Sequence, residues 1–248
     1  NLCPILLPRL FPSAPNLRPT YEEFVAMLKY EGSDEDSLKL AKVAKTIRNV
    51  YAKQTNFLII YGGGPSTLAR NVGIPTDLAK SIIDAWFKAF PGVQAWQEAT
   101  TEFAKQEGYA LTAYGNRRHV TEGILSGDNQ EAGRWSRQAV NYQIQGCAAD
   151  ILKVVLAEAH RTGLFRDTGA ILIAPIYDEI TSSVPKSEAA DYVQRLVQLM
   201  AVTPPGHAIP MEAEVSIGPH SLGELIELGA NPSSAAIMAA CDGKPPHE

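Results

Sequence analysis

Residues 48–64, RNVYAKQTNFLIIYGGG, join a helical pattern to an abrupt end. An amide, a cation and two aromatic rings recur every four residues: Asn49, Lys53, Phe57 and Tyr61. On an α-helix each step of four residues turns the side chain by only ~40°, so the four would form one stripe. Three glycines and Pro65 then end the helix, because they remove Cβ atoms and a backbone donor.

This stripe suits a nucleotide. Lys53 offers a mobile charge to phosphates, and the two rings offer faces on which a base or sugar can pack. The alternative is structural, because aromatic residues at helical spacing usually belong to a core and a lysine beside them usually reaches water. These residues alone favour the structural interpretation. The glycine run is not a P-loop, since it follows a helix and no Gly-Lys-Ser/Thr closes it.

The composition is typical of a globular protein. The chain has 248 residues, of which 45% are hydrophobic, enough for one large domain or two small ones. The net charge of −5 gives no overall basic signature, so a nucleic acid would have to bind local basic patches. Three such patches are Lys42–Lys53, Arg117–His119 and Arg134–Arg137, and each could equally be a solvated face.

Three cysteines without a CxxC pattern argue against a disulfide framework and against a zinc site. A reducing, cytoplasmic-type compartment therefore fits best. No apolar run reaches the ~20 residues that a membrane span needs, so no membrane partner is expected.

The periodicity predicts an α+β fold, mostly helical, with strands in the second half. Helices are predicted over residues 21–29, from 34 into 48–61, and over 65–72, 76–90, 93–106, 131–161 and 187–201. Strands are predicted over 109–114, 117–120, 170–174, 179–184 and 211–217. A polar loop is expected over 121–130 and a short helix or turn over 222–228. Residues 1–20 are expected to be irregular or extended, and residues 229–248 to be disordered.

The long helix predicted over 131–161 carries a polar stripe of Arg137, Asn141 and Gln145, spaced four residues apart among apolar positions. Polar groups in such a helix need partners. One interpretation is a buried network that ties the helix to the neighbouring hairpin. The other is a row of donors for the minor groove of DNA, whose acceptors are nearly the same for every base pair.

Asp178 and Glu179 stand side by side between two apolar runs that predict a β-hairpin. In a strand they would point to opposite faces, so one would meet a metal and the other would support it. Two hard oxygens favour Mg²⁺. A solvated turn is the alternative, but the apolar flanks of 173–176 and Ile180 predict a buried sheet.

Together these motifs resemble family A DNA polymerases, the bacterial DNA polymerase I type, from about Lys45 to Gly223. The family motif Lys-x-x-x-Phe-x-x-x-Tyr-Gly stands here as Lys53, Phe57, Tyr61 and Gly62. The element Asn-x-x-x-Gln-Gly-x-Ala-Ala-Asp is Asn141 to Asp150, with Arg137 one turn earlier. The hairpin motif, His-Asp-Glu in most members, is Tyr177-Asp178-Glu179.

The resemblance implies template-directed DNA synthesis, in which a dNTP gives its nucleotidyl group to the primer 3′-hydroxyl at two Mg²⁺ ions. It implies a catalytic metal ligand at Asp178, with Glu179 close by. It implies that Lys53, counted with the catalytic residues, holds the triphosphate together with Arg48, that Phe57 packs on the sugar and that Tyr61 stacks at the template position. The implied contacts to primer-template DNA are Gly62, Arg117, Arg118, Arg137, Asn141, Gln145 and Tyr177.

The resemblance also implies a domain order and a location. A Pro-rich segment and helix (1–40) would precede a fingers subdomain (41–120) and the carboxy-terminal part of a palm subdomain (121–228), followed by a disordered tail (229–248). The expected location is the cytoplasm of a bacterial or phage-infected cell.

Two departures from the family pattern stand out. The arginine expected one turn before Lys53 is replaced by Asn49, and Arg48 lies ~100° off the stripe unless the helix rotates locally. The family's first acidic motif, Asp-Tyr-Ser-x-Ile-Glu-x-Arg, is absent from residues 1–52. We therefore expect the other catalytic Asp to come from a second polypeptide or a missing amino-terminal region. The alternatives are a non-catalytic nucleic-acid-binding or assembly subunit and, less favoured, a metal-dependent phosphohydrolase.

Overall fold

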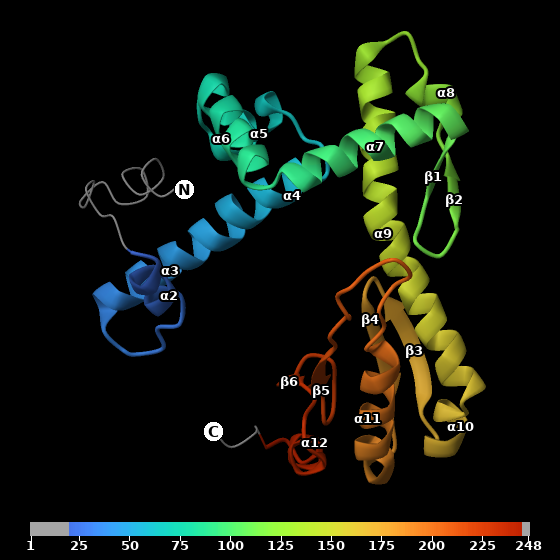
Figure 1. Ribbon diagram of the computed structural model, residues 1–248. Helices are drawn as coiled ribbons and strands as arrows, with labels where there is room; N and C mark the ends of the chain where they lie inside the picture. The colour runs from blue at the N-terminus through green and yellow to red at the C-terminus, as the bar shows by residue number, and fades with distance from the viewer. Residues whose placement is uncertain (1–19, 245–248) are drawn as a thin grey trace. The chain divides into compact units, whose positions relative to one another are not determined.

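The computed structural model describes residues 20–244, which fall into two compact units that meet in sequence at Glu102 and Phe103. Helices make up most of both units, and the β-structure consists of three two-stranded antiparallel sheets (Figure 1). The predicted α+β class is therefore confirmed. The Pro-rich stretch expected to be irregular lies, up to residue 19, outside the described residues.

The first unit is helical throughout its described part. Its elements are α2 (Tyr21–Leu28), α3 (Glu35–Thr46), η1 (Ile47–Lys53), α4 (Gln54–Ile60), α5 (Pro65–Val72) and α6 (Thr76–Ala89), and α7 (Pro91–Glu107) continues into the second unit. The predicted helix-capping residues form the expected hydrogen bonds. Thr20 and Glu23 form a reciprocal capping box at α2, and the Asp34 carboxylate accepts from the Ser37 backbone N–H at 2.8 Å. Pro91 begins α7 in addition to ending α6.

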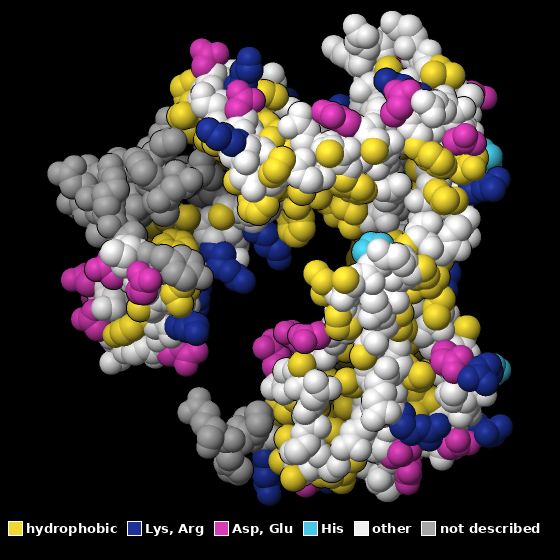
Figure 2. Space-filling model, viewed as in Figure 1, with side chains coloured by type: hydrophobic (Ala, Val, Ile, Leu, Met, Phe, Trp, Pro, Cys, Tyr) yellow, Lys and Arg dark blue, Asp and Glu magenta, His cyan; other side chains and the backbone are white. Residues whose placement is uncertain are grey.

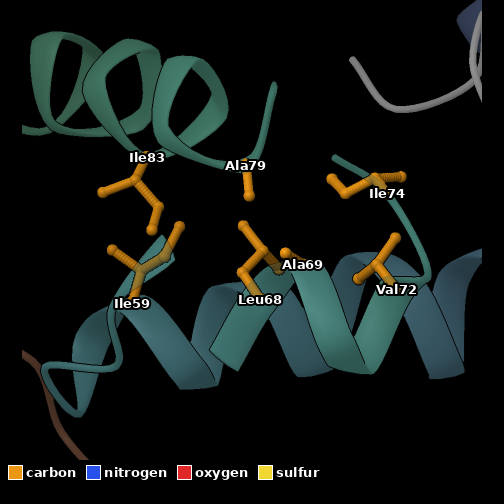
Figure 3. Packing of buried hydrophobic residues seen from close by; sticks show 7 residues of the cluster. All are labelled: Ile59, Leu68, Ala69, Val72, Ile74, Ala79 and Ile83. Atoms are coloured by element: carbon orange, nitrogen blue, oxygen red, sulfur yellow. The ribbon is translucent and has the colours of Figure 1, made fainter. Parts of the chain in front are cut away.

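The core of the first unit lies where α4, α5 and α6 meet (Figure 3). Ile59 projects from α4, Leu68 from α5 and Ala79 from α6, and each is at most 1% exposed. Burying a large aliphatic side chain contributes roughly 1.5–3 kcal/mol. The same helix that carries the candidate stripe is thereby anchored by its opposite side.

The second unit is built around one long helix, α9 (Asn129–Arg161). Its other elements are β1 (Tyr109–Leu111), β2 (Arg117–His119), α8 (Thr121–Ile124), α10 (Leu164–Thr168), β3 (Ile171–Ile176), β4 (Glu179–Ser183), η2 (Lys186–Glu188), α11 (Ala189–Met200), β5 (Glu214–Ile217), β6 (Ile226–Ala230) and α12 (Ser234–Cys241). One apolar cluster joins α9 to β1 and α8, and another joins it to α10 and α11. The amino-terminal half of α9 therefore holds the β1–β2 hairpin, and the other half holds α10 and α11.

Two predictions for connecting segments are wrong. The polar loop expected over 121–130 contains the short helix α8 and the start of α9. Gly123 and Ile124 are buried there, and a Cβ on Gly123 would collide with the Trp135 ring, so packing against α9 fixes this helix. The short helix or turn expected over 222–228 includes the first residues of β6, which pairs with β5.

The tail expected to be disordered over 229–248 is ordered through residue 244. It completes β6 and forms α12, which Ser233 caps by accepting from the Ala236 backbone N–H at 3.2 Å. Alanine has the highest helix propensity, and Ile237 and Ala240 are fully buried. The small residues that made the segment resemble a tail thus form a packed helix.

Among residues 20–244, no helix combines the length and the apolar character that crossing a membrane requires.

Candidate functional site

The first group of candidate residues lies on the helical rod from α3 through η1 to α4, which is continuous as predicted (Figure 1). Its central part is not α-helical: Ile47–Lys53 forms a π-helix. Residues five apart lie ~140° apart around an α-helix, whereas the i→i+5 bonds of a π-helix bring them to nearly the same face. The π-turn therefore moves Arg48 toward the face that carries Lys53.

Both cations of this face are exposed, and Figure 2 shows Lys and Arg side chains gathered along one side of the rod. The Arg48 guanidinium donates to the Asn49 side-chain oxygen at 3.3 Å. The Lys53 ammonium lies 5.8 Å from the centre of the Phe57 ring. Two positive groups five residues apart, on the face that the π-turn brings together, form a surface that suits a polyanion.

Phe57 and Tyr61 complete the stripe. Their rings are nearly parallel, at an interplanar angle of 11° and a centroid distance of 6.1 Å. Phe57 is 45% exposed and therefore lies outside the core cluster, although Ile59 on the same helix is buried. The structural interpretation of the stripe requires buried rings, so the exposure of Phe57 favours a binding surface.

The carboxyl end of α4 is fixed on two sides. Gly62, in a left-handed conformation at φ 76°, donates its N–H to the Ile59 carbonyl, and Gly63 donates to the Leu58 carbonyl at 2.7 Å. This pairing is a Schellman cap, and a Cβ on Gly63 would overlap Leu58. The Gln97 side-chain amide of α7 also donates to the Ile59 and Ile60 carbonyls at 2.8 and 2.7 Å. Tyr61 is thus held at a rigid helix end.

The second group lies on α9. Arg137, Asn141 and Gln145 are exposed and follow one another by one turn. A buried network, one of the two interpretations of this stripe, is therefore wrong. The exposed row consists of amide and guanidinium groups, the types of donor and acceptor that pair with the edges of base pairs.

The β1–β2 hairpin brings Arg117 and Arg118 to the same region of the second unit. The Arg117 guanidinium lies 4.5 Å from the centre of the Tyr109 ring. Arg118 donates to the Gln138 side-chain oxygen of α9 at 3.0 Å and lies 5.9 Å from the Tyr142 ring. Arg118 therefore contacts α9 beside the part that carries Arg137 and Asn141, while Arg117 lies over Tyr109 within the hairpin.

The acidic pair lies at the tip of the β3–β4 hairpin, where Ile176 pairs with Glu179. Tyr177 and Asp178 form the two-residue turn, so Asp178 does not lie in a strand and the expected opposite orientation of the two acids does not apply. Tyr177 is 92% exposed and takes a left-handed φ of 55°, which is uncommon for a residue of its size. Such local strain is concentrated at functional sites.

Glu179 begins β4, and its carboxylate accepts from the Thr181 hydroxyl at 2.9 Å. Asp178 is exposed. Within residues 20–244, no group of three or more His, Cys, Asp or Glu side chains is arranged to hold a metal ion. The hairpin therefore offers a partial donor set of hard oxygens. Both acids are exposed, but one Glu179 oxygen already accepts a hydrogen bond from Thr181.

The prediction that the hairpin belongs to a buried sheet is wrong for the described chain. β3 pairs with β4 alone, and Ile171 and Ile173 on it are 67% and 58% exposed. Apolar, β-prone sequence predicts burial only when a further layer covers the strand. Within residues 20–244 no strand pairs with the free edge of β3.

The candidate residues thus form three groups within the two units. Arg48, Lys53, Phe57, Tyr61 and Gly62 lie on or at the end of one helical rod in the first unit. In the second unit, Arg117 and Arg118 lie on the hairpin that packs against α9, which carries Arg137, Asn141 and Gln145. Tyr177, Asp178 and Glu179 lie at the tip of the β3–β4 hairpin. Sequence reasoning gave no role to Thr112, Asn116 and Asp150, which join the β1–β2 hairpin to α9. The signal was present, because Asp150 is a carboxylate in an otherwise apolar part of a helix.

Comparison with known proteins identifies relatives of the chain. A family model described as DNA polymerase family A matches residues 32–223. DNA polymerase I of Chloroflexus aurantiacus is 33% identical over 178 residues, which cover 72% of this chain and 19% of that protein. The thermostable DNA polymerase I of Thermus aquaticus is 33% identical over 169 residues, which cover 67% of this chain and 20% of that protein. The DNA polymerase of Mycobacterium phage D29 is 33% identical over 151 residues, which cover 61% of this chain and 22% of that protein.

A solved structure shares the fold. It is the POL domain of Pol1 from M. smegmatis in complex with DNA primer-template and dNTP, with a TM-score of 0.60 and 24% sequence identity. The match covers 79% of this chain and 33% of that chain. The chain spans about a fifth of the length of the curated relatives that it matches.

Proposed function

Because the chain belongs to DNA polymerase family A, we propose that it takes part in template-directed DNA synthesis, the transfer of a nucleotidyl group from a dNTP to a primer 3′-hydroxyl. The observation that carries this proposal is the stripe of Lys53, Phe57 and Tyr61, of which Lys53 and Phe57 are exposed and Tyr61 is half-buried, on a helix whose other side is buried. A cation followed by two parallel rings offers one group for the phosphates, one face for the sugar and one face for a template base.

In this proposal the incoming triphosphate binds the first unit. Lys53 and Arg48 neutralise its phosphates, Phe57 packs on its sugar and Tyr61 stacks at the template position. Charge-assisted hydrogen bonds from an ammonium and a guanidinium orient the reacting phosphate, and fixed orientation lowers the barrier to transfer. Lys53 belongs to the catalytic set for that reason.

The second unit holds the primer-template. Arg117 and Arg118 contact backbone phosphates, which supply affinity independent of sequence. Arg137, Asn141 and Gln145 contact base edges in the minor groove, and the exposed Tyr177 contacts DNA at its turn. In the first unit, Gly62 contacts DNA at the half-buried end of α4. A polymerase must accept every base pair, and minor-groove acceptors are nearly independent of sequence.

Asp178 is the proposed ligand of the Mg²⁺ cofactor, with Glu179 close by. Its accessible carboxylate fits that ion, which commonly takes one or two carboxylates together with phosphate oxygens. When bound, Mg²⁺ would supply positive charge to the phosphate oxygens and would favour ionisation of the primer hydroxyl. The donor set is incomplete, since the described residues include no third acidic or imidazole side chain beside this pair.

We therefore infer that a further catalytic carboxylate reaches the hairpin from an upstream region or from a second polypeptide. The free apolar edge of β3 supports this inference, because an unpaired strand with exposed isoleucines is suited to accept another strand. A second candidate function rests on the same incomplete donor set, namely a nucleic-acid-binding or assembly subunit that has the fold without catalysis.

The purified 248-residue chain is expected to show no primer extension with Mg²⁺, because Asp178 and Glu179 alone do not complete a two-ion site. The measurement is extension of a labelled primer-template, with an active DNA polymerase as the positive control. Addition of an upstream or partner segment that carries the missing carboxylate should restore extension. Robust extension by a pure monomer would show that the catalytic acids have been misplaced, and failure of every such segment would favour the non-catalytic function.

Deleting Asn49 is expected to leave nucleotide affinity within about threefold of the parent, because α-helical bonding would then bring Arg48 to the lysine face without a π-turn. By contrast, Arg48→Ala should weaken affinity roughly tenfold through loss of a charged phosphate contact. The measurement is equilibrium binding of a dNTP to the complex that extends primers. Asn49→Ala is the control of unchanged length. A deletion as harmful as Arg48→Ala would contradict the role of the π-turn.

A further inference from the structure

Asp150 is a buried acid that none of the proposed steps uses. It is 4% exposed and lies on α9, one turn beyond Gly146. Its carboxylate accepts from the Thr112 hydroxyl at 2.7 Å, across 38 residues of sequence. Burial raises its pKa, but hydrogen bonds from Asn116 and Thr112 and the charge of Lys153 outweigh burial, so the pKa lies below its ordinary value. The group is therefore a charged acceptor in the interior.

The carboxylate binds both ends of one turn. The Thr112 N–H donates to the Asn116 carbonyl at 2.9 Å, and the Asn116 N–H donates to the Thr112 hydroxyl oxygen at 3.1 Å. Asp150 accepts from the side chains of the same two residues. This set of hydrogen bonds closes the loop between β1 and β2 and fastens it to α9.

The attachment is close. A Cβ on Gly146 would lie 2.8 Å from the Thr112 methyl group, so the hairpin contacts α9 directly beside Gln145 of the polar row. Arg117 follows the fastened turn immediately, and Arg118 reaches Gln138 on α9. The position of both guanidinium groups relative to the row therefore depends on how the turn is held.

We propose that Asp150 is a positioning residue that aligns Arg117 and Arg118 with the polar row of α9, so that the two arginines bind backbone phosphates of the same DNA duplex. The inference rests on the proposed function, because DNA is the ligand of this surface. Asp150 itself touches no DNA. Asp150 contributes by fixing the position of the arginines, because a guanidinium group forms a strong hydrogen bond to a phosphate only when the two lie at hydrogen-bonding distance.

The test is the salt dependence of DNA binding by the 248-residue chain, with a primer-template duplex as the probe. Each lost phosphate contact reduces the slope of log K against log salt by ~0.9. Asp150→Ala should therefore reduce the slope by up to ~1.8, as should Arg117→Ala combined with Arg118→Ala. A triple variant that combines Asp150→Ala with both arginine substitutions should have the same slope as the double arginine variant, because the single and double changes remove the same contacts. Asp150→Asn, which keeps an acceptor for Thr112, should retain most of the slope.

Tyr114→Phe is the matched control on the same turn. The Tyr114 hydroxyl is buried and has no hydrogen-bond partner among the described residues, so its removal should change neither slope nor affinity. Thermal unfolding of each variant separates positioning from folding. An Asp150→Ala chain with a lower Tm and an unchanged slope would overturn the proposal, as would a fully additive triple variant.

Amide hydrogen exchange tests the attachment without DNA. In Asp150→Ala the Gly115 and Asn116 amides should exchange at least about tenfold faster, while buried Ala139 on α9 stays protected. Unchanged protection of the turn would overturn the proposal. If the parent chain shows no salt-dependent DNA binding, the proposed function fails at this surface and the DNA part of the inference fails with it. The exchange result still decides separately whether Asp150 holds the hairpin.

Discussion

Replacing Asp178 with alanine is expected to lower the rate of nucleotide addition by about a thousandfold or more in the assembly that extends primers. The turn presents this carboxylate to solvent, whereas the carboxylate of Glu179, also exposed, accepts a hydrogen bond from the Thr181 hydroxyl. Loss of a metal ligand removes several kcal/mol of stabilisation from the transition state, and ~4 kcal/mol corresponds to a thousandfold in rate. Single-turnover extension at saturating dNTP measures the effect on the chemical step.

Asp178→Asn is the most informative companion variant. Asparagine is as well suited to a turn as aspartate, so it keeps the hairpin while removing the charge. It should be nearly as inactive as Asp178→Ala. Asp84→Ala, at an exposed position on α6, controls for the general effect of losing an acid and should be fully active. Substantial turnover by Asp178→Asn would exclude Asp178 as the metal ligand.

Replacing Lys53 with alanine is expected to weaken dNTP affinity by roughly ten- to a hundredfold, the equivalent of a charged hydrogen bond worth about 1.5–3 kcal/mol. The loss should be similar for all four nucleotides, because the triphosphate is common to them. Lys53 is exposed and contacts the Phe57 ring, so its removal leaves no buried group unpaired. The apparent Kd from pre-steady-state incorporation of each dNTP provides the measurement.

Two other variants define what the Lys53 result means. Tyr61→Ala should mainly reduce discrimination between correct and incorrect nucleotides, since its ring is assigned to the template position. Lys80 is an exposed lysine on α6 of the same unit, and Lys80→Ala should change neither the dNTP affinity nor the discrimination between nucleotides. If affinity is unchanged in Lys53→Ala, the stripe is structural and the nucleotide assignment is wrong.

The helices of the first unit were largely predictable because their signals are local. The Thr20–Glu23 capping box, the Asp34 cap and the glycines after Tyr61 act within a few residues, and the structure uses each of them. The continuity from α3 to α4 was also predictable. The π-turn within it was not, because no residue of 47–53 is a recognised signal for i→i+5 bonding.

Where tertiary packing decides whether a helix forms or a strand is buried, the local sequence pattern did not predict the outcome. α8 exists because Gly123 admits the Trp135 ring, and α12 exists because Ile237 and Ala240 are buried. The apolar run of β3 predicted a strand correctly, but its exposure depends on which other strands are present. Local sequence specifies the element more reliably than the environment of the element.

The candidate site follows the same division. Spacing of four residues was sufficient to group Lys53 with its rings, and Arg137 with Asn141 and Gln145, because helical period alone sets these neighbours. The contact between Thr112 and Asp150 joins a loop to a helix 38 residues away, and no periodicity predicts it. The hairpin with the acids at its tip was predicted, and the structure has it. The left-handed conformation of Tyr177 was not predicted, because its residue type does not favour it.

The π-turn has a consequence for evolutionary comparison. A helix that contains a π-turn has one more residue than an α-helix with the same number of turns. In the gene, this extra residue is one additional codon. An ungapped alignment with the family pattern would pair Asn49 with the arginine expected one turn before Lys53 and would suggest a lost function. A gap between Arg48 and Lys53 would pair that arginine with Arg48 instead. The number of residues between two functional groups can therefore change by one while their orientation in space is preserved.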